Sequence, residues 1–278
     1  MMNNSPFKNL KNINFLFNDL NVNGYRGGKG HPLIIVHGSG PGASSIGNWR
    51  TVLDELALNF DVLAIDLIGF GLSDKKTTLP YFDYELWISQ IRAAIDYLNV
   101  SEVFLIGHSL AGSLVLKAAA LDHRVKRVVT TGTMGTLMPS NAHLNYVWKC
   151  PKTKEEMRKA AESLIYDNSF ITDEYLDFRM QVIGSQEYQS YFDQMFCENF
   201  NQYIEAASLT ETEIKNIQIP ILMLHGMNDL PIPAEYTSIP LAFSLPHADL
   251  ILLKNCNHSI ALEKTDKFLA AVNFHLKQ

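Results

Sequence analysis

Ser109 stands in a setting that favours a nucleophile. It lies in VFLIGHSLAGSLVLKAAA, where an apolar run typical of a strand leads into a run typical of a helix, with small residues around the serine. A serine on a sharp strand-to-helix turn needs small neighbours, because the helix must approach the strand closely. The usual pattern is G-x-S-x-G; here Ala111 takes the last glycine position and Gly112 follows it. Since such a turn accommodates one more methyl group, we predict that Ser109 is a catalytic nucleophile.

Two later residues could activate this serine. A serine hydroxyl needs a base to accept its proton, and the base needs a carboxylate to orient it. Asp229 ends the run ILMLHGMND, and His258 ends the next apolar run, LILLKNCNH. Taken alone, such an Asp is more often a turn or cap residue, and such a His is as often structural. Together, however, the three residues occur in the order Ser, acid, His, and each lies just beyond a strand. A purely structural role does not explain this arrangement, so we predict a triad of Ser109, His258 and Asp229.

Two backbone N–H groups should bind the negative charge that develops on the substrate oxygen. We expect one from Leu110, at the start of the helix after the nucleophile, and one from Ser39, in the loop SGPG after the strand PLIIVHG. Glycines such as Gly40 let this loop approach a ligand, although a plain turn is the alternative. We expect His37, His108 and His225 to pack or to support the site residues from behind, with His108 also in the substrate pocket, and Asp66 and Asp74 to fix a turn.

The elements around these residues alternate between strand and helix. Nearly all-apolar runs at 32–38, 61–69 and 101–109 indicate buried strands, and helical patterns follow them, for example at 48–59 and 84–100. Buried apolar strands are typical of parallel sheets covered on both faces, and short connections favour right-handed crossovers. The fold class is therefore α/β, a mostly parallel, doubly wound sheet.

A helical insert interrupts this alternation. From about 136 to 212 the patterns are amphipathic and helical, with no strand between them, and the α/β pattern then resumes. We divide the chain into a first core part at 1–135, a lid at 136–212 and a second core part at 213–278. Ligands of such sheets bind beyond the carboxyl ends of the strands, so the insert is expected to cover that edge.

Composition narrows the class of protein. The chain has 278 residues and a net charge of −6, which argues against nucleic acid and anionic membrane surfaces as partners. The first 20 residues contain neither a secretory signal nor a membrane span. Three widely spaced cysteines suggest reduced thiols, so we expect a cytoplasmic protein. We expect no metal and no cofactor, because the triad and two amide donors suffice.

The segment HGSGPGASSIGNWR at 37–50, together with the predicted triad, resembles the α/β-hydrolase superfamily. Within it, the chain is most similar to the meta-cleavage product hydrolases, which cut carbon–carbon bonds in ring-opened aromatic catabolites. The resemblance runs from about residue 30 to the end and includes LIYDNSFITDEYLDFRMQ at 164–181, which is similar to the lid of that family.

This resemblance implies a substrate and a way to bind it. Asn48 and Arg179 would bind the carboxylate of a dienol, and a guanidinium suits a carboxylate because it can donate two parallel hydrogen bonds. It also implies a homodimer. The chain departs from the family at three positions: His108 replaces an Asn, Ser259 replaces a Trp, and Pro231 stands where a bulky apolar residue is common.

Three functions remain open from the sequence. The first is a serine hydrolase that cleaves the carbon–carbon bond of a 2-hydroxy-6-oxo-dienoate. The second is a carboxylesterase, thioesterase or lactonase acting on a small acyl substrate, which His108 and Ser259 favour. The third is a non-enzymatic receptor that keeps the fold and the triad. In each case the ligand is a small molecule.

Overall fold

The protein is built on an eight-stranded, mostly parallel sheet. A computed structural model describes residues 5–197 and 199–278. The strand order is β1-β2-β4-β3-β5-β6-β7-β8, and all neighbours from β4 to β8 in this order pair in parallel, which confirms the predicted fold class. The strands are β1 (Leu10–Phe17), β2 (Leu20–Gly27), β3 (His31–Val36), β4 (Phe60–Ile65), β5 (Val103–His108), β6 (Val125–Thr131), β7 (Ile221–Gly226) and β8 (Ala248–Leu253).

The N-terminal hairpin is an element that the sequence analysis did not predict. Strands β1 and β2 pair antiparallel, and β2 pairs antiparallel with β4. A two-residue turn joins them at Asn18 and Asp19, whose φ angles of 49° and 60° suit the tight turns of hairpins. The apolar residues of β1 do not alternate regularly, and β2 contains two glycines and two asparagines, which are uncommon in strands, so neither pattern was recognised.

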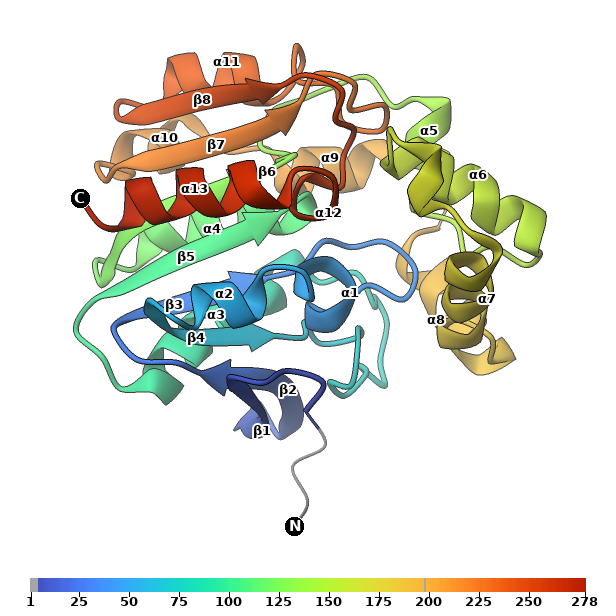
Figure 1. Cartoon of the computed structure of the whole chain (residues 1–278), viewed down its shortest axis with the longest axis horizontal. Coiled ribbons are helices and arrows are strands. Elements are labelled where there is room, and N and C mark those ends of the chain that lie inside the picture. Colours follow the sequence, from blue (N-terminus) through green and yellow to red (C-terminus); the bar gives the residue numbers. More distant parts are fainter. Residues whose placement is uncertain (1–4, 198) are drawn as a thin grey trace.

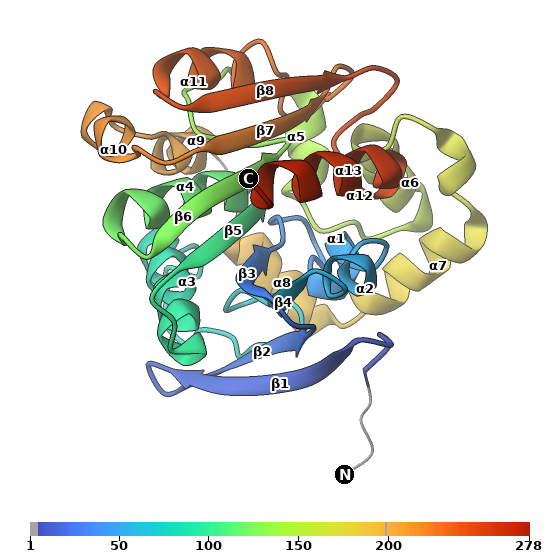
Figure 2. The ribbon, with the colours of Figure 1, turned by 60° about the vertical axis from the view of Figure 1, so that its left-hand side comes forward.

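Helices cover both faces of the sheet (Figure 2). One core lies between the sheet and helices α3 and α4, and a second lies between the sheet and α2, α12 and α13. The single helix expected at 48–59 is instead two short helices, because the chain turns at Thr51, whose hydroxyl donates to Ala261 O at 2.9 Å. The helices that flank the sheet are α1 (Ser45–Trp49), α2 (Leu53–Leu56), α3 (Tyr84–Leu98), α4 (Leu110–Leu121), α11 (Ser238–Ser244), α12 (Ile260–Glu263) and α13 (Thr265–Leu276).

Helices alone connect β6 to β7 in the described part of the chain. In Figure 1, α6, α7 and α8 lie beyond the arrowheads of β5, β7 and β8, at the carboxyl ends of the strands. Local capping starts these three helices: Thr153, Thr172 and Ser185 each accept a hydrogen bond from the backbone N–H three residues later. The connecting helices are α5 (Ala142–Val147), α6 (Lys154–Leu164), η1 (Asn168–Phe170), α7 (Asp173–Val182), α8 (Gln186–Met195), α9 (Asn201–Ala207) and α10 (Glu211–Asn216).

The last strand differs from the buried strand that its sequence suggests. β8 lies at the edge of the sheet, and its Ile251 and Leu252 side chains are 40% and 39% exposed. The apolar run of β8 therefore forms an edge strand and not a buried one.

Among the described residues, every helix is too short or too polar to cross a bilayer.

Candidate active site

Ser109 occupies a strained turn between β5 and α4. Its φ of 59° and ψ of −124° lie in a region that side chains other than glycine rarely adopt. A Cβ at Gly107 would lie 2.2 Å from Ala111 O, and one at Gly112 would lie 2.1 Å from Thr133 Oγ1. Both glycines are therefore required for close packing, whereas the Ala111 methyl is accommodated within the core. The departure from G-x-S-x-G leaves the turn intact.

His258 and Asp229 form a buried pair beyond β8 and β7. His258 Nδ1 lies 2.7 Å from Asp229 Oδ2, and the Ile232 N–H donates to Asp229 Oδ1 at 2.9 Å. Gly132 makes room for the pair, because a Cβ there would lie 2.8 Å from His258 Nδ1. Burial alone would raise the pKa of Asp229, but the charge of His258 and hydrogen bonds from His225 and His258 hold it well below its usual value. Asp229 is therefore a carboxylate that fixes the orientation of the His258 ring.

His225 supports the acid from behind. Its Nε2 lies 3.1 Å from Asp229 Oδ2 and 2.8 Å from Ile232 O. Because both of these oxygens are acceptors, this nitrogen carries a proton. Its Nδ1 then accepts from the Ser238 hydroxyl. Of the two roles expected for His225, packing and support of the site residues, the structure shows the second.

The loop after β3 passes directly beside Ser109. A Cβ at Gly38 would lie 3.1 Å from Ser109 Cβ. The Gly38 N–H is already bound to Asn48 Oδ1 at 3.0 Å. In contrast, the N–H groups of Ser39 and Leu110 have no acceptor among the described residues. The two amides expected to bind an oxyanion are therefore the ones left free.

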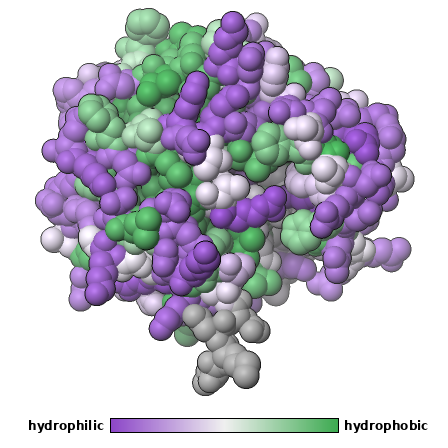
Figure 3. Space-filling view, viewed as in Figure 1, coloured by the Kyte–Doolittle hydropathy of each residue, from purple (hydrophilic) through white to green (hydrophobic). Residues whose placement is uncertain are grey.

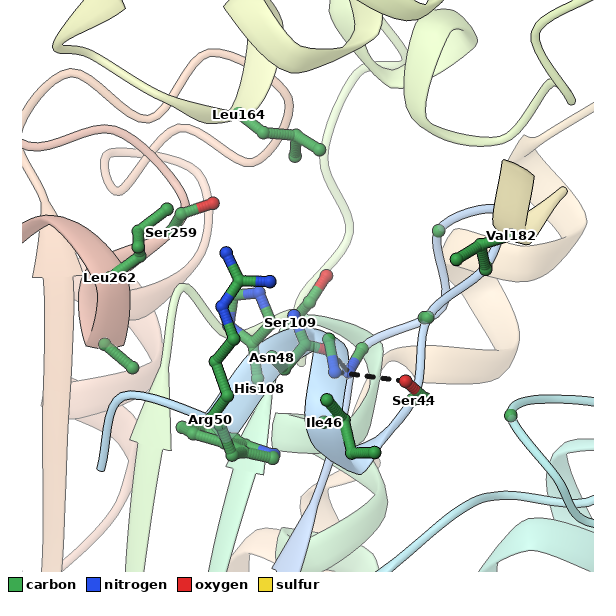
Figure 4. Close-up of a pocket in the computed structure, with 18 of the residues that line it drawn as sticks. Ser44, Ile46, Asn48, Arg50, His108, Ser109, Leu164, Val182, Ser259 and Leu262 are labelled. Atoms are coloured by element: carbon green, nitrogen blue, oxygen red, sulfur yellow. Dashed lines mark hydrogen bonds between the residues drawn. The ribbon is translucent and has the colours of Figure 1, made fainter. Parts of the chain in front are cut away.

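A cavity of about 400 Å³ connects these groups. Figure 4 shows Asn48, His108 and Ser109 close together at the strand ends, with Leu164 facing them from the lid helices. Neither Ser109 Oγ nor His258 Nε2 has a hydrogen-bond partner in the described part of the chain, so the bond between them that a triad needs is not formed here, although both residues line the same cavity. All predicted site residues except the buried Leu110 and Asp229 line the cavity: Ser39, Gly40, Asn48, His108, Ser109, Arg179 and His258.

Arg179 reaches this cavity from lid helix α7. Its Nη2 donates to Pro41 O at 2.6 Å, so the guanidinium also holds the loop after β3. Its Nε is buried, with no partner among the described residues. Asn48 uses Oδ1 to accept from Gly38, which leaves its NH₂ group to donate to a ligand. The structure therefore brings Arg179 and Asn48 to the cavity that contains Ser109.

His108 is a neutral neighbour of His258. Its ring lies 4.6 Å from the His258 ring, centroid to centroid, and its Nδ1 lies 3.1 Å from Thr131 O. Burial, with the nearby charge of His258, lowers the pKa of His108 to about 3. His108 can therefore exchange hydrogen bonds in the pocket without adding charge to it.

The remaining polar residues singled out from the sequence fix turns or pack, as expected. Asp66 accepts hydrogen bonds from the Ser45 and Leu72 backbone, and Asp74 accepts from the Asn21 N–H. His37 Nε2 accepts from the Leu67 N–H. The three cysteines form no disulfide.

Glu263 is a residue that the sequence analysis missed. Its Oε1 accepts from the Asn257 N–H at 3.0 Å, beside His258, and its Oε2 accepts from the Tyr166 N–H at 2.7 Å, at the end of α6. The Ser259 N–H also donates to Leu164 O at 3.0 Å. Burial raises the pKa of Glu263, although these N–H groups favour its charged form. One carboxylate therefore joins the loop that carries His258 to the segment after α6.

Known proteins resemble this chain over most of its length. A family model described as the alpha/beta hydrolase fold matches residues 31–164. The 2-hydroxy-6-oxo-2,4-heptadienoate hydrolase of Pseudomonas putida is 32% identical over 247 residues, which cover 88% of this chain and 89% of the relative. The 2-hydroxymuconate semialdehyde hydrolase of a Pseudomonas species is 30% identical, covering 93% and 91%. The structure of the meta-cleavage product hydrolase CumD from Pseudomonas fluorescens is 29% identical, with a TM-score of 0.91 and coverage of 95% and 97%.

This chain belongs to the meta-cleavage product hydrolases of the α/β-hydrolase superfamily. The resemblance expected from the sequence is thereby confirmed. The protein is an enzyme of the α/β serine hydrolase kind, and the alternative of a receptor on the same fold is set aside.

Glu263→Gln should loosen two segments of this hydrolase at once. A neutral amide has one acceptor oxygen in place of two, so it cannot hold both Asn257 and Tyr166. We expect amide hydrogen exchange at 164–167 and 255–259 to accelerate about tenfold, since a hydrogen bond to a charged group contributes about 1.5–3 kcal/mol. The exposed Glu162→Gln on α6 is the matched control. Unchanged exchange in either segment would contradict the shared tie.

His108 should make stability depend on pH. Its folded pKa of about 3 lies below the 6.5 of an unfolded His. The unfolded chain therefore takes up this proton below pH 6.5 while the folded chain does not, and the free energy of unfolding falls as the pH drops from there towards 3. His108→Asn should show a shallower decline between pH 7.5 and 5 in urea denaturation, whereas exposed His123→Asn should match the wild type. Equal slopes for the wild type and His108→Asn would refute this.

Proposed function

We propose that this enzyme hydrolyses the C5–C6 bond of a 2-hydroxy-6-oxo-2,4-dienoate. The observation that carries the proposal is Arg179, a cation that lines the cavity of Ser109 and whose side chain makes one hydrogen bond, from Nη2 to Pro41 O, among the described residues. Its remaining guanidinium N–H groups could donate charge-assisted hydrogen bonds to a substrate carboxylate. The names of the two relatives above, both hydrolases of ring-cleavage products, support the same substrate class.

In this proposal the substrate carboxylate binds Arg179 and the Asn48 NH₂ group, which places C6 over Ser109. The dienol first becomes the ketone, as the O2 proton is lost and C5 gains a proton. The C6 carbonyl oxygen then accepts hydrogen bonds from the Ser39 and Leu110 N–H groups, the free amides beside the nucleophile.

The triad of Ser109, His258 and Asp229 carries out the cleavage. His258 accepts the Ser109 proton while Ser109 Oγ attacks C6, and the nearby Asp229 carboxylate stabilises the imidazolium. The C5–C6 bond breaks, its electron pair is delocalised through C4 and C3 onto O2 as a dienolate, and O2 takes up the proton that His258 received from Ser109, which gives the 2-hydroxydienoate. Water then hydrolyses the acyl group on Ser109. The net reaction converts the dienoate and water into a 2-hydroxydienoate and a carboxylic acid.

The helical segment at 136–212 is proposed to act as a lid on the core formed by 1–135 and 213–278. Several hydrogen bonds link the two parts at the site, among them those joining Arg179 to Pro41, Tyr188 to Gly42, Trp148 to Ser39, Leu164 to Ser259 and Tyr166 to Glu263. Since Arg179 belongs to the lid, binding of the carboxylate would hold the lid closed and exclude water from the reacting bond.

Ser109→Ala and Arg179→Gln should separate chemistry from binding. Ser109→Ala should abolish the loss of the dienolate's visible absorbance in stopped flow. Arg179→Gln should lower kcat/KM for the dienoate about a hundredfold, because each hydrogen bond to a charged group contributes about 1.5–3 kcal/mol. Arg158→Gln, a lid arginine paired with Asp173 outside the cavity, should match the wild type.

The same assay tests the second candidate, a carboxylesterase, thioesterase or lactonase. The neutral His108 beside Ser109 favours it, and ester cleavage uses the same acyl chemistry on the same groups. Efficient turnover of short p-nitrophenyl esters, insensitive to Arg179→Gln, with no turnover of dienoates, would replace the proposed substrate with an ester.

We also propose a homodimer through the edge of β8. This strand has no partner on its outer side, and an edge strand can pair antiparallel with its own copy about a two-fold axis. Figure 3 shows apolar residues near the top of the molecule, where β8 and α11 lie in Figure 1, and Phe243 of α11 is 89% exposed. These exposed apolar groups next to the free edge would be covered in the dimer.

Ile251→Lys should therefore yield a monomer in light scattering, because it places a charge in the proposed interface. Leu16→Lys, on β1 at the opposite edge and 74% exposed, should leave the dimer unchanged. A monomeric wild type, or dissociation by Leu16→Lys alone, would contradict pairing through β8.

A further inference from the structure

Trp148 joins the helices at 136–212 to the loop that carries Ser39. It directly follows helix α5, and its indole Nε1 lies 3.0 Å from Ser39 Oγ. An indole nitrogen can only donate, so the Ser39 hydroxyl accepts this hydrogen bond. Both residues are almost fully buried, which keeps water from competing for the bond. The contact therefore links two segments that lie 109 residues apart in the chain.

The bond to Trp148 is the only hydrogen bond that any atom of Ser39 forms among the described residues. The preceding residue is held by a different contact, in which Asn48 Oδ1 accepts from the Gly38 N–H at 3.0 Å. The Ser39 N–H is the group expected to bind the negative oxygen of the reacting carbonyl. Its direction therefore depends on the hydrogen bond that the side chain of the same residue accepts from Trp148.

Aromatic rings enclose Trp148 and hold its indole in place. Phe196 stacks on the indole, with ring centroids 5.0 Å apart and planes inclined by 16°. Phe200 and Tyr203 contact the indole edge-on, with centroids at 5.5 and 5.8 Å. Stacked and edge-to-face pairs are the favoured arrangements of aromatic rings. This cluster, built from the end of α8 and the start of α9, therefore fixes the direction of the indole N–H.

Trp148 lies behind the site and not in it. Ser39 lines the cavity that contains Ser109, whereas Trp148 does not. A donor of an oxyanion hole must lie about 2.7–3.1 Å from the position that the negative oxygen takes in the transition state. A small displacement of Ser39 would therefore raise the barrier, while a substrate carboxylate would keep its contacts to Asn48 and Arg179.

We propose that Trp148 is a positioning residue of the oxyanion hole: its indole N–H holds the Ser39 hydroxyl and thereby directs the Ser39 N–H at the carbonyl oxygen under attack. This inference rests on the proposed catalysis by Ser109 with Ser39 as an oxyanion donor. Cleavage of a carbon–carbon bond and of an ester would use the same two amides. The role of Trp148 is therefore the same in either reaction.

Trp148→Phe and Ser39→Ala each remove one partner of this hydrogen bond, and the double variant removes both. Phe keeps an aromatic ring beside Phe196, and Ala keeps the backbone N–H. For a 2-hydroxy-6-oxo-2,4-dienoate with a methyl group on C6, we expect each single variant to lower kcat about tenfold with KM unchanged, a smaller loss than removal of a whole oxyanion donor causes. The double variant should lose no more than either single variant, because both changes remove one interaction.

Trp87→Phe is the matched control. Trp87 is also a fully buried indole, and its Nε1 donates to Ile68 O at 2.9 Å. Neither of these two residues lines the cavity. The control removes the same kind of hydrogen bond as Trp148→Phe, so it should lower the urea midpoint to a similar extent while kcat stays at the wild-type value.

Several outcomes would overturn the role of Trp148. A wild-type kcat in Ser39→Ala would do so even if Trp148→Phe did not fold. A rise of KM with unchanged kcat in Trp148→Phe, losses that multiply in the double variant, or an equal fall of kcat in Trp87→Phe would do so as well.

The same comparison with p-nitrophenyl acetate separates this inference from the proposed function. If the wild type hydrolyses this ester and not the dienoate, the proposed carbon–carbon hydrolysis is refuted. The kcat values of the variants for the ester then decide whether Trp148 positions the oxyanion hole, by the same criteria.

Discussion

The site depends on the backbone strain at Ser109. A residue other than glycine in such a conformation costs about 1–3 kcal/mol, so the surrounding structure must hold it there. Two close approaches do so, between Gly107 and Ala111 O and between Gly112 and Thr133. The Ser109 N–H also donates to Thr131 O at 2.9 Å. Strand β5, helix α4 and the end of β6 thus jointly define where the hydroxyl stands and where the Leu110 amide points.

A second constraint is the buried charge on Asp229. A carboxylate taken out of water needs hydrogen bonds, and His225, His258 and the Ile232 N–H provide them. This arrangement leaves His258 Nε2 as the free nitrogen, directed away from the acid. The helices at 136–212 contact the same centre, because Arg179 binds the loop of Ser39, and Glu263 joins the loop of His258 to Tyr166 after α6. The position of these helices and the geometry of the site are therefore connected by hydrogen bonds.

The sequence predicted those features that local patterns encode. The strand, small-residue turn and helix around Ser109 lie within 20 residues, and Asp229 and His258 each end a recognisable apolar run. Asn48 and Arg179 came from family resemblance, since nothing in their local pattern marks them. The role of Glu263 could not be read from the sequence, because it arises where α12 meets the end of α6. The hairpin β1–β2 was missed because the apolar residues of β1 do not alternate regularly and β2 contains glycines and asparagines.

The most direct test of this account is covalent labelling of the protein with a fluorophosphonate, followed by peptide mass spectrometry. If the strained turn and the buried His258–Asp229 pair activate one hydroxyl, a single adduct will form on the peptide that contains Ser109, and His258→Asn will slow its formation by orders of magnitude. No adduct, or an adduct on another residue, would contradict the central claim that Ser109 is the nucleophile.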